Sequence, residues 1–156
     1  MSKLARYEAA LATSAQAVRI RPDDPQAWYD RGIALSNVDH YEEALEAFER
    51  ALRLKRDYAE AWNKQGIALD NLNRLQEGLQ SFEEALRLKP DFPEAWDNKG
   101  VALGNLGNDE KALPCFEEAT KLDPEFAPAW YHKGLALGKL NRFEESAAAF
   151  SEGSKH

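Results

Sequence analysis

Residues 25–58 read PQAWYDRGIALSNVDHYEEALEAFERALRLKRDY, and the chain repeats this pattern every 34 residues. Tryptophan sets the period, at positions Trp28, Trp62, Trp96 and Trp130. A glycine follows each tryptophan by four residues, and a phenylalanine follows it by twenty. These two columns are Gly32, Gly66, Gly100, Gly134 and Phe48, Phe82, Phe116, Phe150. Such self-similarity at a fixed period is the sequence signature of a repeat array.

Each copy of the repeat predicts two amphipathic helices joined by a turn. In the first copy, Trp28, Gly32 and Leu35 share one helical face, because they are spaced by four and three residues. Residues 41–54 show the same kind of spacing. Two antiparallel helices approach closely only where side chains are small, so Gly32 and Ala44 predict the crossing point. The pattern therefore indicates an all-α fold of stacked helix pairs.

The residues that end and begin the helices also recur. The turn inside each copy carries a residue type that tolerates a left-handed backbone. These turn residues are Asp39, Asn73, Gly107 and Asn141. An aspartate also precedes a glutamine or glutamate by three residues in three copies, which predicts a capping box for the first helix. These aspartates are Asp23, Asp57 and Asp91.

The columns of Trp, Gly, Leu, Phe, Ala and Pro resemble the tetratricopeptide repeat, a helix–turn–helix unit, over nearly the whole chain. The resemblance implies a right-handed superhelical solenoid of antiparallel helix pairs. We expect one continuous solenoid domain whose repeats are residues 25–58, 59–92, 93–126 and a slightly truncated 127–156. Residues 1–24 match the second helix of an incomplete earlier repeat. We therefore expect a fragment of a longer protein, the alternative being a natural short protein with its own cap.

Composition and charge exclude several classes of function. The formal net charge of −7 and pI of about 5.1 argue against a nucleic-acid partner and against an anionic membrane surface. No apolar run has the length of a transmembrane span, and the N-terminus lacks the apolar core of a signal peptide. The one cysteine fits a reducing compartment. We expect a cytoplasmic protein that binds neither nucleic acid nor membrane.

No motif in the sequence predicts catalysis, a cofactor or a metal site. The chain has three histidines, and neither a metal-binding helix motif nor a phosphate-binding loop is present. Cys115 stands where other copies have Ala47, Ser81 and Ala149, which indicates a small packing residue. We expect a non-enzyme without cofactor.

The family resemblance implies that function lies on the concave wall built from the first helices, which receives an extended peptide or a partner's helix. The residues expected on this wall are Tyr29, Asp30, Ile33, Asn37, Asn63, Lys64, Ile67, Asn71, Asp97, Asn98, Val101, Asn105, Tyr131, His132, Leu135 and Lys139. Glu60, Asp70 and Glu94 are expected at its edges.

Three features of this wall have alternative interpretations. The aliphatic column serves either as an apolar floor for a ligand or as packing between repeats. The asparagine column either tracks a bound peptide backbone, since an amide both donates and accepts, or closes helix ends. Acidic wall residues outnumber the lysines, which favours a basic ligand. The aliphatic column is Ile33, Ile67, Val101 and Leu135, and the asparagine column is Asn37, Asn71 and Asn105.

The wall does not match the carboxylate clamp of chaperone-binding members of the family, in which Lys, Asn, Asn, Lys and Arg hold a C-terminal carboxylate. The corresponding residues in the second to fourth copies match once; they are Asn63, Ile67, Asn98, Pro128 and His132. Those in the first three copies do not match; they are Tyr29, Ile33, Lys64, Glu94 and Asn98. An Hsp70 or Hsp90 adaptor role is therefore not expected.

The sequence thus predicts a non-catalytic interaction or scaffold module that binds a peptide or protein segment in a concave groove. The alternative is a structural spacer or self-association segment whose groove stays empty, and RNA binding is disfavoured by charge.

Two local features carry their own predictions. Apolar residues such as Leu4 and Phe143 predict association through the ends of the array. Pro114 predicts that its helix starts late or bends near residues 110–113, because proline inside a helix removes a hydrogen bond.

Overall fold

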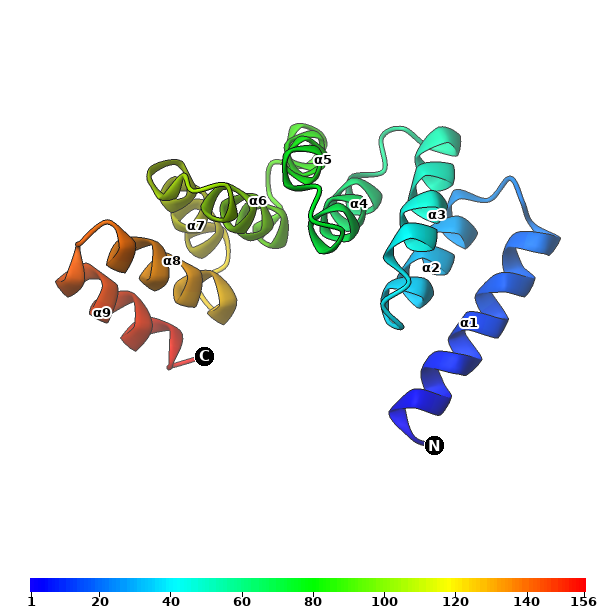
Figure 1. The fold of residues 1–156 in the computed structure, drawn as a ribbon, viewed down its shortest axis with the longest axis horizontal. Coiled ribbons are helices and arrows are strands. Elements are labelled where there is room, and N and C mark those ends of the chain that lie inside the picture. Colours follow the sequence, from blue (N-terminus) through cyan, green and yellow to red (C-terminus); the bar gives the residue numbers. More distant parts are fainter. The chain divides into compact units, whose positions relative to one another are not determined.

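The computed structural model describes residues 1–156 and consists of nine α-helices joined by short turns, without β-strands (Figure 1). The helices are α1 (Lys3–Ile20), α2 (Pro25–Ser36), α3 (Tyr41–Leu54), α4 (Ala59–Asn71), α5 (Leu75–Leu88), α6 (Pro93–Asn105), α7 (Asp109–Leu122), α8 (Ala127–Lys139) and α9 (Phe143–Gly153). The predicted all-α class of helix pairs is confirmed. The chain divides into two compact units, Met1–Ser81 and Phe82–His156, with the division inside α5.

In the first unit, α2 packs on α3, which packs on α4, and α1 packs on α2. Leu35, Leu45 and Phe48 form a shared core with Leu69 of α4. The Phe48 ring is fully buried and fills the space beside Gly32. A Cβ at Gly32 would collide with that ring. The glycine column therefore exists because the phenylalanine column needs its space.

The second unit is built on the same plan. Helix α6 packs on α7, α7 on α8 and α8 on α9. Phe116 lies against Gly100, where an added Cβ would sit 2.5 Å from the ring, and Phe150 lies against Gly134 in the same way, at 2.6 Å. Both copies thus use the same close approach of helices.

The side chain of each tryptophan forms a hydrogen bond with the loop that precedes its helix. The indole N–H of Trp28 donates to the carbonyl of Pro22 at 2.8 Å, and that of Trp62 donates to the carbonyl of Arg56 at 2.9 Å. Trp96 and Trp130 bond the loops before them in the same way, six residues back. Because the acceptor is a backbone carbonyl, arginine serves at position 56 as well as proline does elsewhere.

The predicted left-handed turn residues are confirmed. Asp39, Asn73 and Asn141 have φ near 60°, and Gly107 has a φ of 83°. In each turn the residue after the left-handed one donates its backbone N–H to a carbonyl of the preceding helix. In the first turn, the N–H of His40 donates to the carbonyl of Leu35 at 2.9 Å. The sequence placed these turns correctly because few residue types adopt this conformation at low cost.

The predicted capping boxes are wrong. Asp24, one residue after the expected Asp23, caps α2 by accepting from the N–H of Gln26 at 3.0 Å. Helices α4 and α6 begin after the buried aromatic residues Tyr58 and Phe92, and neither has a side-chain cap. Packing of these aromatic rings, rather than capping, determines where the two helices start.

The predicted late start of the helix that contains Pro114 is wrong, and the bend stays a prediction. Helix α7 begins at Asp109, the position equivalent to the start of α3. Asn108, not Asp109, is the cap and accepts from the N–H of Lys111 at 3.2 Å. Pro114 is exposed on the outer face of α7, so the carbonyl of Glu110 that loses its partner lies near water.

Candidate functional site

The candidate residues of α2 divide between packing and exposure. The Tyr29 ring is half-buried and stacks on Tyr58 with centroids 5.0 Å apart. Ile33 packs against the core of the first unit. Asp30 and Asn37 are exposed, and Asp30 accepts from the side-chain amide of Gln26 at 2.9 Å. Of these four candidate residues, only Asp30 in α2 and Asn37 just after its end have exposed side chains.

The candidate residues of α4 are more deeply placed than the sequence suggested. Asn63 is only 4% exposed, while Lys64 and Ile67 are partly exposed. The side-chain amide of Asn71 donates to the carbonyl of Ile67 at 2.9 Å. This bond favours the interpretation in which the asparagine closes the end of its own helix.

In the second unit, α6 and α8 are joined through a buried carboxylate. Asp97 is 4% exposed, and the Nδ1–H of His132 donates to it at 2.8 Å. The His132 ring also lies 5.6 Å from the ring of Phe116. Asp97 therefore holds α8 in place and is not a freely accessible contact for a ligand.

The remaining candidates of the second unit are partly or fully accessible. Val101 and Asn98 are half-buried, and Asn105 is exposed at the end of α6. On α8, Tyr131 is 54% exposed and Leu135 is 39% exposed. Large apolar side chains exposed to this extent on one helix favour contact with a partner.

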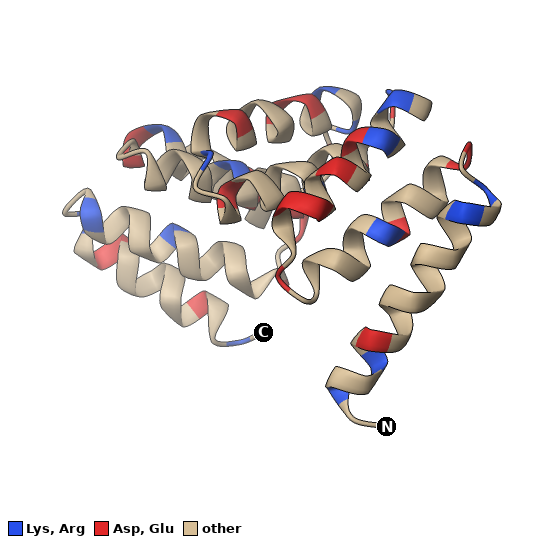
Figure 2. Cartoon of the chain, turned by 45° about the vertical axis from the view of Figure 1, so that its right-hand side comes forward, with Lys and Arg blue, Asp and Glu red and all other residues tan.

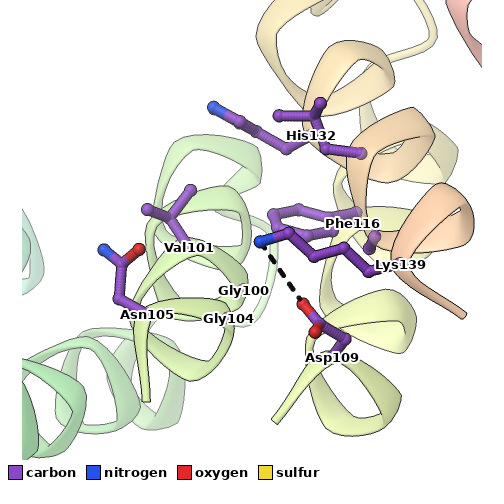
Figure 3. Close-up of a pocket in the computed structure, with 10 residues that line it drawn as sticks. Gly100, Val101, Gly104, Asn105, Asp109, Phe116, His132 and Lys139 are labelled. Carbon is purple, nitrogen blue, oxygen red and sulfur yellow. Dashed lines mark ion pairs between the residues drawn. The ribbon is translucent and has the colours of Figure 1, made fainter. Parts of the chain in front are cut away.

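Five of the candidate residues line one open hollow in the second unit (Figure 3). The hollow lies between α6, α7 and α8. Its lining residues are Gly100, Val101, Gly104, Asn105, Asp109, Phe116, His132, Leu135, Ala136 and Lys139. Apolar and charged groups thus converge on the same small volume, which is the usual composition of a binding pocket.

Two short residues leave room for this hollow. Gly104 has the position of Ser36, Asp70 and Gly138 in the other copies, and Asp109 replaces the larger side chains of Tyr41, Leu75 and Phe143. Gly104 and Asp109 are not among the predicted site residues. Both residues contribute by having little or no side chain. The space that they leave becomes a hollow only where α6, α7 and α8 pack together.

The hollow contains one loose ion pair. The Nζ of Lys139 lies 4.0 Å from an Oδ1 of Asp109, and the two side chains are 61% and 23% exposed. In Figure 3 the Lys139 side chain extends across the hollow, and its ammonium group points toward Asp109. A direct charge-assisted hydrogen bond is about 2.7–2.9 Å long, so neither charge has its best partner here.

Asp70 lies elsewhere than the sequence predicted. Its Oδ1 is buried between α4 and α5 against Gly78 and has no hydrogen-bond partner. Burial raises the pKa of this carboxyl to about 7. The Asp70 carboxyl therefore packs between the two helices of its repeat, and it is not a free acidic group at the edge of the groove.

The structure shows no cluster of three or more His, Cys, Asp or Glu residues that could hold a metal ion. Burial raises the pKa of the Cys115 thiol, so the reactive thiolate form is disfavoured. None of the helices combines the length and the apolar character needed to cross a membrane. Acidic residues outnumber basic ones, 27 to 20, and both kinds are spread over the helices (Figure 2).

Sequence profiles described as tetratricopeptide repeat match residues 2–61, 59–92, 93–126 and 127–153. No curated protein matches the chain by sequence.

Several solved structures share the fold. A crystal structure of MamA superposes with a TM-score of 0.85 at 19% identity, covering 96% of this chain and 87% of that one. MamA 41-end from Desulfovibrio magneticus RS-1 gives 0.84 at 25% identity, over 96% and 84%. YrrB, whose structure is titled a TPR protein with an unusual peptide-binding site, gives 0.76 at 26% identity, over 96% and 77%.

Proposed function

The chain belongs to the tetratricopeptide repeat family, and on this premise we propose that it is a non-catalytic module that binds a peptide or protein segment. The binding surface is the groove face of α6 and α8. The observation that carries the proposal is the hollow between α6, α7 and α8, where exposed Leu135 stands beside charged and amide groups.

The chemistry of this surface suits an extended peptide. Val101, Leu135 and the Phe116 ring provide an apolar floor, and Asn105 offers an amide at the rim. An amide donates and accepts at once, so it can pair with both groups of a ligand's peptide bond. YrrB, a relative in fold, is described as having a peptide-binding site. The unpaired, buried Cys115 fits a reducing compartment such as the cytoplasm.

Selection from a library of random peptides tests the proposal. The chain is used as bait beside the variant Tyr131→Ala/Leu135→Ala, which removes exposed apolar contacts from α8. The control is Leu54→Ala, because Leu54 is 43% exposed, close to the 39% of Leu135, but lies at the end of α3. We expect the selected peptides to bind the chain and the control equally and to bind the α8 variant at least about tenfold more weakly. Equal binding to all three proteins would contradict the proposal.

A second role, self-association, is favoured by exposed apolar side chains on the first and last helices. Leu4 and Ile20 of α1 are exposed, and Phe143 of α9 is 67% exposed. Large apolar side chains left exposed on the terminal helices of a repeat array favour association. We propose that copies of the chain associate through α1, α9 or both, and the assay for this is given in the Discussion.

A further inference from the structure

We propose that the hollow between α6, α7 and α8 receives the side chain of a lysine or arginine of the bound segment. Asp109 is its counter-charge, and Lys139 is the internal occupant that it displaces. This inference rests on the proposed function and narrows it to one residue of the ligand.

The position of Lys139 supports a basic side chain as the occupant. Its stem spans the hollow and its ammonium group faces Asp109 (Figure 3). The 4.0 Å separation leaves the carboxylate of Asp109 without a close partner, although only 23% of this side chain is exposed. A ligand cation that enters from solvent is not tethered to α8, so it can approach to hydrogen-bonding distance.

The walls of the hollow match the stem of such a side chain. Val101, Phe116 and Leu135 supply apolar surface. Long basic side chains bury their methylene groups on surfaces of this kind while their charged heads meet a counter-charge. Gly100 and Gly104 leave one wall as bare backbone. A neutral aliphatic side chain would fill the same space but would leave Asp109 partly desolvated and unpaired.

The charged pair is specific to this place in the chain. Asp109 and Lys139 correspond, two repeats earlier, to Tyr41 and Asn71. Lysine replaces asparagine only in the fourth copy, and aspartate replaces a large side chain only in the third. The fold places the Nζ of Lys139 4.0 Å from the Oδ1 of Asp109. With Lys139 turned away, Asp109 would be the one carboxylate that lines the hollow, so the charge of the hollow would favour a cation.

The test is a titration of the full chain with N-acetyl-arginine amide, followed by the amide NMR shifts of the residues that line the hollow. N-acetyl-citrulline amide, which has nearly the same shape without the charge, and N-acetyl-glutamate amide are the comparison probes. We expect arginine to shift the amides of Val101, Asn105 and Leu135 and to bind at least about tenfold more tightly than citrulline.

Three variants sharpen the result. Asp109→Asn should weaken arginine binding at least about tenfold, as expected for loss of a charged hydrogen-bond partner. Lys139→Asn, which restores the residue of the other copies, should strengthen it about two- to fivefold, because a loose surface ion pair no longer competes. Lys121→Asn, at an exposed position of α7, should change nothing. Thermal unfolding of each variant confirms that the fold is intact.

The inference is overturned if citrulline or glutamate binds as well as arginine, if arginine moves none of these amides, or if Asp109→Asn leaves its binding unchanged. These outcomes are distinct from failure of the proposed function. Selected peptides that lose affinity on Leu135→Ala but not on Asp109→Asn would support groove binding and contradict the basic occupant. Peptides indifferent to Leu135→Ala would contradict groove binding itself.

Discussion

Removing the carboxyl of Asp70 should stabilise the protein. The Oδ1 of Asp70 is buried against Gly78 without a hydrogen-bond partner, and the equivalent residue of the first copy is Ser36. A buried polar group without a partner costs about 1–3 kcal/mol. Because the Asp70 side chain is only partly buried, the lower part of that range applies. We expect Asp70→Ser to raise the free energy of unfolding at pH 8 by about 1–2 kcal/mol.

The gain in the free energy of unfolding on Asp70→Ser should depend on pH. Burial raises the folded-state pKa of Asp70 from 3.8 to about 7, so folding favours the protonated carboxyl. The unfavourable contribution is absent below the unfolded-state pKa near 4, grows as pH rises, and is complete above about 7. The difference between the variant and the unmodified chain should therefore increase from pH 4 to pH 8.

The same carboxyl explains the glycine at position 78. Ala44 and Ala112 hold the equivalent place in two other copies, but a Cβ at position 78 would collide with the Oδ1 of Asp70. Gly78→Ala alone should lower the free energy of unfolding by about 1–3 kcal/mol, because the new methyl group overpacks the space between the helices. In the Asp70→Ser background the clash with the carboxyl is gone, and the close contact that remains is the carbonyl oxygen of Gly66, 3.0 Å from the new Cβ. The usual preference for alanine inside a helix, about 0.5–1 kcal/mol, offsets that contact, so Gly78→Ala should change the free energy of unfolding by less than about 1 kcal/mol there.

Urea unfolding of the four proteins, followed by circular dichroism at pH 4, 6 and 8, measures this double-mutant cycle. Asp57→Ser, at an exposed position, controls for the loss of one negative charge. Additive effects of the two substitutions, or a stability gain of Asp70→Ser that does not change with pH, would refute the reasoning.

Three further predictions concern the repeat and its ends. Gly32→Ala should destabilise by about 1–3 kcal/mol, because the new methyl group meets the buried Phe48 ring; a neutral result in urea unfolding would show that the ring can move aside. Trp130→Phe should cost about 0.5–1.5 kcal/mol beyond the packing change, since the indole N–H loses its bond to the Pro124 carbonyl; hydrogen exchange of that loop checks this. Light scattering over a concentration series should show association that Phe143→Ser weakens, and a chain that stays monomeric throughout would contradict the end-to-end contact.

Much of the fold is readable from the sequence because each column reports a local constraint. Gly32 and Phe48 recur together since one needs the space that the other leaves. Asp39 and its equivalents recur because the turn requires a positive φ. These requirements act within one helix pair, so a single copy of the repeat is enough to reveal them.

The exposure of the groove residues was less predictable, because it depends on the neighbouring repeat. Tyr29 and Asp97 occupy equivalent positions. Asp97 meets His132 of the following copy, and Tyr29 meets Tyr58, the last residue of its own copy, where the chain enters α4. Tyr131 occupies the same column in the last copy and is 54% exposed. Position in the repeat thus determines which way a side chain points, and the next copy determines whether it is covered.

The hollow could not be predicted for a related reason. Asp109 departs from the repeat, because the other copies have Tyr41, Leu75 and Phe143 at this position, but the sequence does not show what its carboxylate contacts. Its meeting with Lys139 joins α7 to α8 over thirty residues of sequence. Only the folded unit shows that the side chains of Asp109 and Lys139 line the same hollow.

The central claim, binding of a peptide on the groove face of α6 and α8, is tested most directly by NMR mapping of the highest-affinity peptide from the random library on the full chain. The account predicts the largest amide shifts at Val101, Asn105, Leu135 and Lys139, around the hollow. Shifts confined to the outer faces of α7 and α9, with these four amides unmoved, would contradict it.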